Sequence, residues 1–277
     1  MLSLLALASS AVWGTSDFFG GLMAKRLPAV AVVGITQSLA FVLLCVVVLV
    51  RLALGHPPEW GSWVGWAMLA GLSGATGLVA FYTALASGTM GVVAPIASMG
   101  VLVTVGLGVA SGDTPSSWVW VGIAVAVIGI VLASGPEVSG AVSPRPVLLA
   151  CVAALGFGLA LFSLDRGSRD SMLMTLWGMR GTSVVIFAAA AVVLRSVGGA
   201  GRTHLVPLAF IGSADLLANV LFATASSRGQ VSIASVLGSL YPIATILLAR
   251  IVLKERLQRI QQIGVVFALA GAAIISL

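Results

Sequence analysis

The 277-residue sequence contains few charged residues, histidines and cysteines. Only 8% of its residues are Asp, Glu, Lys or Arg, whereas 60% are hydrophobic. So little polar surface cannot cover a soluble globule, which excludes a water-soluble enzyme or binding domain. The formal net charge of +6 is scattered along short segments between apolar runs and forms no basic patch with interleaved aromatic residues. Nucleic acid is therefore not an expected partner.

The motifs of nucleotide-, metal- and serine-dependent enzymes are also missing. The chain has no GxxxxGK[ST] phosphate loop, no HExxH, no CxxC and no serine nucleophile with an obvious histidine partner. Its two histidines, His56 and His204, stand at the edges of predicted loops. We therefore expect no enzymatic activity, no cofactor and no metal. Active transport by such a chain would have to use a proton, ion or substrate gradient.

Long apolar runs are what the chain has in abundance. A helix needs about 20 apolar residues to cross a bilayer, and polar or Gly/Pro breaks divide the sequence into ten such runs. These predicted membrane helices are residues 4–24, 30–54, 63–86, 92–110, 118–134, 147–164, 172–194, 205–225, 231–253 and 260–277. The runs are continuous and not alternating, which favours helices over barrel strands. The sequence predicts an all-α integral membrane protein, and we expect the first run to be retained and not cleaved as a leader.

The second half of the sequence repeats the first. Identical residues recur at a constant offset of 141 positions, as in Gly71 and Gly212, Phe81 and Phe222, Thr83 and Thr224, Gly88 and Gly229, Ser98 and Ser239, and Thr104 and Thr245. We predict repeats at residues 1–135 and 147–277, joined by a Pro-, Gly- and Ser-rich linker at 136–146. Because five helices per copy is an odd number, the copies would be inverted in the membrane. Inverted repeats are typical of secondary transporters, with a site between the halves near the bilayer midplane.

Four charged residues lie deep in the predicted apolar helices, where each is costly and is therefore a candidate for function. They are Asp17, Arg180, Asp215 and, near the end of the ninth run, Arg250. The carboxylate of Asp17 could bind a cationic substrate or carry a coupling proton. Alternatively it accepts hydrogen bonds from Thr15, Ser16 or a neighbouring helix, or pairs with an arginine. Arg180 and Asp215 either form a buried ion pair with each other or contact substrate.

Polar, aromatic and proline residues in the same helices give further candidates. Pro95 and Pro242 each remove a backbone donor inside a predicted helix, so we expect kinks that line or gate a pathway or are purely structural. Gln37 falls close to the repeat counterpart of Arg180, and hydroxyl groups concentrate on the ninth run. The candidate pathway residues are Trp13, Asp17, Gln37, Tyr82, Ser98, Arg180, Asp215, Asn219, Ser239 and Tyr241.

Three groups of motifs give the sequence a family resemblance. They are WG at residues 13–14, GVVAPIASMG at 91–100 followed by SGD and Pro115, and LGSLYPIATILLARIVLKE at 237–255 followed by GVVFALAGAAII at 264–275. On these motifs nearly the whole chain resembles EamA-type members of the drug/metabolite transporter superfamily. The resemblance implies a ten-helix alternating-access carrier, usually an exporter of amino acids, nucleosides, other metabolites or drugs. It also implies cytoplasmic termini, whereas the positive-inside rule applied to the loop charges favours the opposite orientation.

Two positions depart from the family pattern. The proline that the pattern expects in the fourth helix is Val101 here, whereas its counterpart Pro242 is present, so the two helices are expected to bend differently. The acidic residue after the fourth helix is Asp113, and Glu255 follows the ninth. Capping is an alternative role for both acids, with Asp113 and Pro115 beginning the fifth helix.

Together these observations predict a secondary transporter that moves a small metabolite or drug-like compound across the cytoplasmic membrane, with export as the favoured direction. Its expected partners are the small-molecule substrate, the lipid bilayer and, on one interpretation of Asp17, a coupling proton. The duplication supplies both halves in one chain, so a monomer would suffice. Two other functions stay open, a non-transporting membrane scaffold or accessory subunit, and a flippase that uses Asp17 and Arg180 on a lipid headgroup.

Overall fold

The computed structural model describes residues 1–58, 60–88, 90–134, 144–195, 198–252 and 259–276, and all the regular elements in these segments are α-helices. In chain order they are α1 (Leu2–Ala24), α2 (Ala29–Ala53), α3 (Trp63–Ser87), α4 (Met90–Ser98), α5 (Gly100–Ala110), α6 (Ser117–Ser134), α7 (Pro144–Leu194), α8 (Arg202–Ser226), α9 (Val231–Gly238), α10 (Tyr241–Val252) and α11 (Arg259–Ser276). The expectation of an all-α protein is confirmed for these segments.

The surface of these helices is apolar. In the described part of the chain, seven helical segments are long and apolar enough to cross a membrane, and α6 and α11 contain shorter apolar stretches. Large aliphatic side chains point outward, with Val193 80% exposed and Val206 78% exposed. Such a surface is expected where lipid surrounds a helix whose backbone groups are satisfied internally. The protein is therefore a multi-pass membrane protein.

α7 consists of two helices joined end to end. Ser171 has extended backbone angles (φ −151°, ψ 105°), so residues 144–170 and 172–194 are separate helical segments. The two predicted runs at 147–164 and 172–194 therefore lie within one element. Residues 136–143 of the predicted linker lie outside the described residues. Its last residues, from Pro144 to Pro146, belong to the first turn of α7, where proline needs no N–H partner.

Two runs that were predicted as single helices are each broken in the middle. The run at 92–110 forms α4 and α5, and the run at 231–253 forms α9 and α10, with residue 253 outside the described residues. The two breaks are equivalent in the repeat, because α4 ends at Ser98 and its counterpart Ser239 directly follows α9. Pro242 lies in the first turn of α10, where its missing N–H is not needed. The break after α4 forms although position 101, the counterpart of Pro242, is a valine. Both runs therefore break, although only the second has a proline there.

The helices exchange partners between the two halves of the sequence. α7 packs against α3, α4 and α5, and we call these four helices bundle A; α1 packs against α8, α9 and α10, which we call bundle B. α2 lies against α7 and α8. Glycines allow the close approaches within each bundle: a Cβ on Gly100 would lie 2.3 Å from Ala154 O, and a Cβ on Gly14 would lie 2.3 Å from Tyr241 O. Van der Waals contact between backbones holds these helices together, because in lipid no hydrophobic force drives helices to associate.

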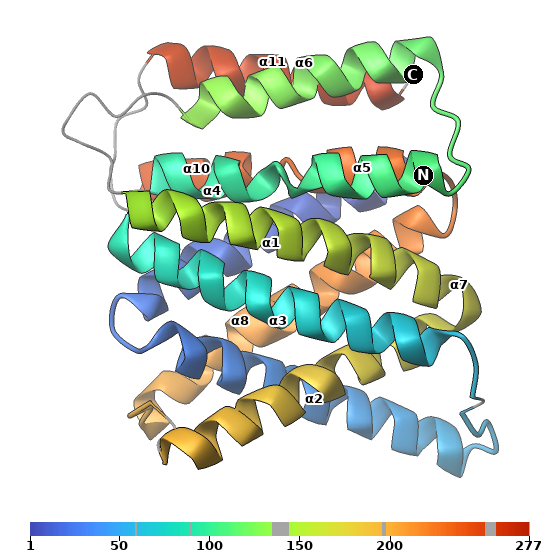
Figure 1. The fold of residues 1–277 in the computed structure, drawn as a ribbon, viewed down its shortest axis with the longest axis vertical. Coiled ribbons are helices and arrows are strands. Elements are labelled where there is room, and N and C mark those ends of the chain that lie inside the picture. The colour runs from blue at the N-terminus through green and yellow to red at the C-terminus, as the bar shows by residue number, and fades with distance from the viewer. Residues whose placement is uncertain (59, 89, 135–143, 196–197, 253–258, 277) are drawn as a thin grey trace.

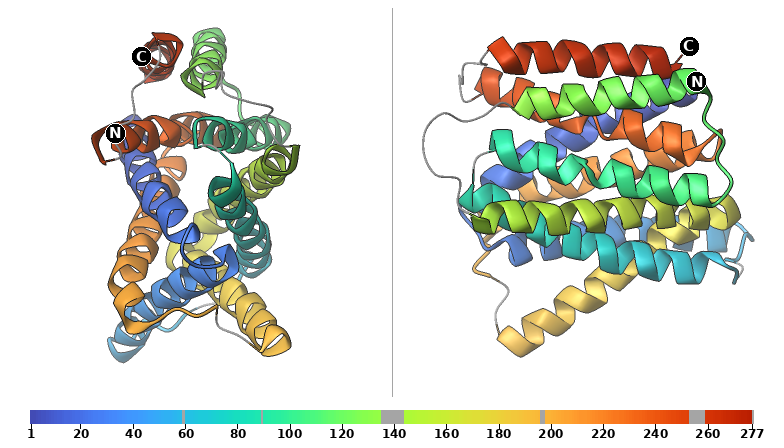
Figure 2. Two further views of the ribbon diagram at one scale, coloured as in Figure 1. Left: turned by 90° about the vertical axis from the view of Figure 1, so that its left-hand side faces the viewer. Right: turned by 45° about the horizontal axis from the view of Figure 1, so that its top comes forward.

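α6 and α11 form a separate pair on one side of the molecule (Figures 1 and 2). Their backbones touch, because a Cβ on Gly129 of α6 would lie 2.2 Å from Ala268 N of α11. α1 begins and α11 ends toward the same end of the molecule (Figure 1). α6 and α11 therefore lie at the periphery, beside bundles A and B.

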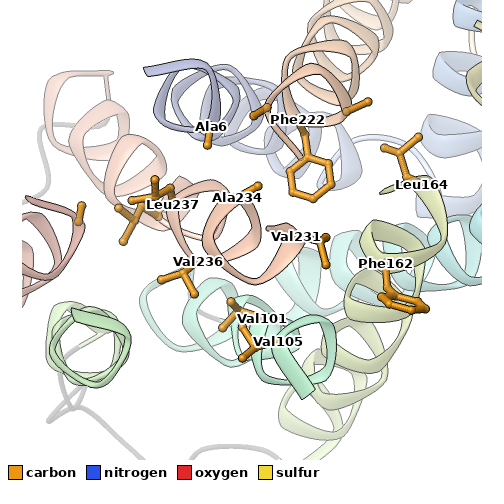
Figure 3. Packing of buried hydrophobic residues seen from close by; sticks show 14 of the residues in the cluster. Ala6, Val101, Val105, Phe162, Leu164, Phe222, Val231, Ala234, Val236 and Leu237 are labelled. Carbon is orange, nitrogen blue, oxygen red and sulfur yellow. The ribbon is translucent and has the colours of Figure 1, made fainter. Parts of the chain in front are cut away.

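Two large clusters of buried apolar side chains fill most of the interior, and a small third cluster contains Trp63, Ala67 and Met174. Figure 3 shows the first, in which Val101 and Val105 of α5 lie beside Val231 and Val236 of α9. The second gathers around Phe81, Tyr82 and Tyr241, together with residues of α1, α2, α4 and α8. Val101 of the first cluster and Tyr241 of the second both line the cavity that is described next.

Candidate functional site

A cavity of about 80 Å³ lies between bundles A and B. That volume admits roughly five water molecules. Its polar lining residues are Asp17, Ser98, Arg180, Asp215, Asn219 and Ser239, together with the aromatic residues Trp13 and Tyr241. The rest is apolar and includes Leu78, Val101, Phe157, Leu161 and Met179, together with the small residues Gly74 and Ala160. The cavity is thus amphipathic, because its lining combines three charged side chains with apolar ones.

Arg180 of α7 and Asp215 of α8 form an ion pair in this wall. Arg180 Nη2 lies 2.8 Å from Asp215 Oδ2, and the side chains are 1% and 12% exposed. The two groups are not aligned as a hydrogen bond, so the contact is an ion pair only. Arg180 Nη1 donates to Gln37 Oε1 of α2, whereas Nε has no hydrogen-bond partner among the described residues. Of the two alternatives for this pair, pairing is therefore observed, and a donor of Arg180 is still free.

Asp215 is held by further donors. Trp13 Nε1 donates to Asp215 Oδ1 at 3.2 Å, Asn219 Nδ2 donates to the same oxygen at 3.2 Å, and Gln37 Nε2 donates to Oδ2 at 3.4 Å. Charge-assisted hydrogen bonds of this kind compensate the desolvation of a buried carboxylate. Four of the predicted pathway residues thus gather around the carboxylate of Asp215.

Asp17 of α1 has a much poorer set of partners. It is 7% exposed, and the hydrogen bond described for its carboxylate comes from Tyr82 Oη of α3, at 3.4 Å. Thr15 and Ser16 do not bond to it; their hydroxyl groups donate to Ala11 O and Ile211 O. No lysine or arginine among the described residues lies within ion-pair distance of Asp17. Of the alternatives for Asp17, a bond from a neighbouring helix is the one observed.

Gly20 gives Tyr82 access to Asp17. A Cβ on Gly20 would lie 2.3 Å from both Cζ and Oη of Tyr82, so any larger residue in this turn of α1 would displace the phenol. Tyr82 belongs to bundle A and Asp17 to bundle B. The Arg180–Asp215 ion pair crosses between the same two bundles. Both carboxylates of the cavity therefore take part in contacts that join bundle A to bundle B.

Ser98 and Ser239 occupy equivalent positions at the two helix breaks. Ser98 Oγ donates to Pro95 O at 2.8 Å, and Ser239 Oγ donates to Val236 O at 2.7 Å. Both acceptors, like both donors, are related by the offset of 141 residues. Each hydroxyl satisfies a carbonyl near the end of its helix and presents its oxygen to the cavity, where it can also accept a hydrogen bond.

The cavity brings together most of the residues that the sequence singled out. Eight of the ten predicted pathway residues line it, and Gln37 and Tyr82 reach it through hydrogen bonds to residues of its wall. Pro95 and Pro242 are not among the described lining residues. Arg250 is exposed at the end of α10, and Glu255 lies outside the described residues.

Sequence reasoning missed the apolar wall and one buried acid. Phe157, Gly74 and Met179 resemble ordinary membrane-helix residues, and no local signal sets them apart. Asp165 is fully buried in α7, where Arg169 Nε donates to its Oδ2 at 3.1 Å. Its spacing of four residues from an arginine was the available signal. Asp165 is not among the residues that line the cavity.

A second cavity, of about 450 Å³, opens where the α2–α3 loop meets the break in α7. Its polar residues include Arg51, His56 and Asp170, and Trp60 and Trp63 stack at 6.0 Å beside them. Trp60 is 84% exposed. Aromatic and basic residues at helix ends are typical of the membrane–water interface. We therefore place the candidate site in the smaller cavity, which lies between the two bundles and is lined by the buried charges.

Comparisons with known proteins agree with this architecture. A family model described as the EamA-like transporter family matches residues 1–135 and 144–277. One crystal structure of a protein superposes with a TM-score of 0.76 and 18% sequence identity, and the match covers 100% of this chain and 98% of that chain. At this identity the likeness concerns the fold alone. No curated protein matches the chain.

Proposed function

Because the chain belongs to the EamA-like transporter family, we propose that it is a secondary transporter that moves a small solute across the cytoplasmic membrane by alternating access, with export as the favoured direction. The observation that supports this best is the charged, amphipathic cavity between two helix bundles. A membrane scaffold would have no use for buried charges around a cavity, since each of them costs at least about 2.5 kcal/mol to insert.

The proposed carrier has ten membrane crossings arranged as two inverted five-helix repeats. In this arrangement α4 with α5 and α9 with α10 each form one broken crossing, and α7 supplies two crossings on either side of Ser171. The equivalent breaks beside Ser98 and Ser239 support the repeat, and so does the position of the two chain ends toward one end of the molecule. Broken helices near the middle of a bilayer are a common feature of transporter binding sites. Both halves are present in one chain, so the proposed unit is a monomer.

The proposed substrate is a small amphipathic cation. With its carboxylates ionised, the cavity has two negative groups and one positive group. Asp215 is balanced by Arg180, and Asp17 is the carboxylate left to attract a positive group. The apolar wall formed by Leu78, Phe157 and their neighbours would hold the apolar part of the substrate. The ring of Trp13 can add a cation–π contact.

Asp17 would also couple binding to the movement of the bundles. A positive group or a proton on this carboxylate competes with the hydrogen bond from Tyr82, which is one of the contacts that join bundle A to bundle B. Binding would therefore weaken a contact across the pathway, which is the differential interaction that a change of conformation requires. On this proposal a substrate and a proton compete for Asp17, so an inward proton gradient drives export.

The test is flux in proteoliposomes. Uptake and efflux of a pooled library of amphipathic amines and other metabolites would be measured with and without a pH gradient, for the wild type, Asp17→Asn and the control Asp165→Asn. Asp165 is also a buried helix carboxylate, but it lies outside the cavity. We expect gradient-dependent flux that Asp17→Asn abolishes and Asp165→Asn retains.

Other outcomes would lead to different conclusions. Intact gradient-dependent flux in Asp17→Asn would contradict the role of Asp17 and leave transport standing. Absence of flux for every compound, together with no ligand-induced rise in the unfolding temperature of folded protein, would contradict transport and favour the scaffold.

A further inference from the structure

The residues Ser111, Gly112 and Asp113 end α5 in a tight turn. Gly112 has a φ of 107°, which side chains other than glycine rarely tolerate. Asp113 N donates to Gly108 O at 3.0 Å, which closes the turn in the manner of a Schellman motif. The turn reverses the chain and carries the side chain of Asp113 to the beginning of α9.

Asp113 caps a helix of the other bundle. Its Oδ2 accepts hydrogen bonds from Ser232 N at 2.9 Å and from Ser232 Oγ at 2.7 Å. Beside it, Gln230 Nε2 donates to Thr114 O at 3.3 Å. A carboxylate at the first turn of a helix satisfies a free N–H and interacts favourably with the helix dipole. Three hydrogen bonds therefore join the loop after α5, in bundle A, to the start of α9, in bundle B.

The capping role suggested by the sequence is thus real but belongs to a different helix. α6 is capped by Ser116, whose Oγ accepts from Val119 N at 3.4 Å. Asp113 is bonded to a residue 119 positions away. The expectation that Asp113 and Pro115 begin the fifth helix is corrected accordingly.

Apolar side chains fill the space between this contact and the cavity. A Cβ on Gly108 would lie 2.6 Å from Ser232 Oγ and 3.0 Å from Val231 Cγ1, so only glycine leaves room for the contact. One turn earlier Val105 is 5% exposed, and Val231 is fully buried beside it (Figure 3). Val101, a further turn along, lines the cavity. These three valines therefore lie between the cavity and the hydrogen bonds of Asp113.

From these contacts we propose that Asp113 and Ser232 form a latch that closes this end of the pathway. The latch must break whenever bundles A and B separate here, and it re-forms when the other end opens. The inference rests on the proposed function, because a gate has a purpose only in a carrier. The latch contact itself can be tested without knowing the substrate.

Asp170 offers a matched comparison within a single bundle. Its Oδ2 accepts from Trp63 N at 3.1 Å and from Ser62 Oγ at 3.2 Å, so like Asp113 it receives one backbone N–H and one serine hydroxyl, here from two neighbouring residues. Asp170 therefore caps α3 from α7, and both helices belong to bundle A. Loss of Asp170 removes a similar cap without affecting a contact between the bundles.

The experiment measures how fast a buried cysteine reacts with a charged, membrane-impermeant maleimide. The background carries Cys45→Ala and Cys151→Ala, and the protein is held in lipid nanodiscs. One reporter is Val105→Cys beneath the latch; the other is Val93→Cys, 1% exposed in α4, toward the opposite end of the same broken crossing. We expect Asp113→Ala to accelerate labelling of Val105→Cys about tenfold, a shift of about 1.4 kcal/mol in the open population. Val93→Cys should not accelerate, and Asp170→Ala should leave both rates within about twofold.

Several results would overturn the proposal. They are an unchanged rate for Val105→Cys in Asp113→Ala, equal acceleration of both reporters, or the same acceleration in Asp170→Ala. If Asp113→Ala does not fold, Asp113→Asn keeps an acceptor oxygen and should accelerate Val105→Cys roughly threefold. Because labelling needs no substrate, a missing flux in proteoliposomes and a failed latch are separate outcomes.

Discussion

Replacement of Arg180 by glutamine should destabilise the protein strongly, because it leaves two carboxylates in the cavity without a cation. Arg180 is 1% exposed, and its Nη2 lies 2.8 Å from Asp215 Oδ2. Removing one partner of a buried ion pair costs about 3–5 kcal/mol, since the remaining charge is neither paired nor solvated. We expect a loss in that range for Arg180→Gln, with Asp17 in the same cavity placing it toward the upper end.

Replacing the other partner, Asp215, by asparagine should cost less, although it breaks the same ion pair. Asp215→Asn leaves the guanidinium of Arg180 with its hydrogen bond to Gln37 Oε1, and the carboxylate of Asp17 lines the same cavity beyond ion-pair distance. The new amide oxygen can still accept from Trp13 Nε1. We expect a loss of about 1–2 kcal/mol, as for a weakened charged hydrogen bond. The double variant Arg180→Gln/Asp215→Asn should recover about 2–3 kcal/mol relative to the sum of the single changes.

The free energy of unfolding would be measured by titrating the protein in dodecyl maltoside micelles with dodecyl sulfate and following helix content by circular dichroism. The control is Arg166→Gln in the first segment of α7, whose guanidinium lies 5.0 Å from the centre of the Phe162 ring outside the cavity. It should cost less than about 1 kcal/mol. Additive losses in the double variant would refute the reasoning, and so would a larger loss for Asp215→Asn than for Arg180→Gln.

Three further predictions concern other parts of the site. Tyr82→Phe removes the hydrogen bond to Asp17 and should cost about 0.5–1.5 kcal/mol in unfolding free energy while changing the gradient dependence of flux; an unchanged dependence would separate the phenol from coupling. Gly100→Ala should cost about 1–3 kcal/mol, because its Cβ would lie 2.3 Å from a carbonyl oxygen of α7, whereas Gly106→Ala, with nothing within 4 Å, should be neutral or stabilising in the same unfolding titration. Gly74→Leu should fill the cavity and abolish flux of all but the smallest substrates without loss of folded protein in size-exclusion chromatography, and undiminished flux would place the pathway elsewhere.

The charged part of the site could be predicted from the sequence because lipid makes each buried charge conspicuous. Asp17, Arg180 and Asp215 stand out in runs of apolar residues, and the structure places all three in one cavity. Their pairing could not be predicted in the same way. Arg180 could have met either carboxylate, and only the packing of α7 against α8 brings Asp215 within 2.8 Å of it.

The apolar wall and the latch gave no sequence signal of comparable strength. Phe157 in an apolar helix can face lipid, a neighbouring helix or a cavity, and the helix sequence has the same apolar composition in each case. Asp113 has a local explanation as the cap of the next helix, and the structure uses it instead on α9, across 119 residues. A hydrogen bond between distant residues depends on how the helices pack, which local propensity does not determine.

By itself the sequence determined the solvent, the helical class and the approximate positions of the long apolar runs, because the thickness of a bilayer and the need to satisfy backbone groups act on each segment separately. It also contained the duplication and the family. The tertiary structure decided that α1 packs with bundle B and α7 with bundle A, that two runs are broken at equivalent positions, and that Asp17 and Asp215 have unequal partners. These features arise from side chains and backbones that meet only after the helices have packed, and van der Waals contact and hydrogen bonds between helices select that packing.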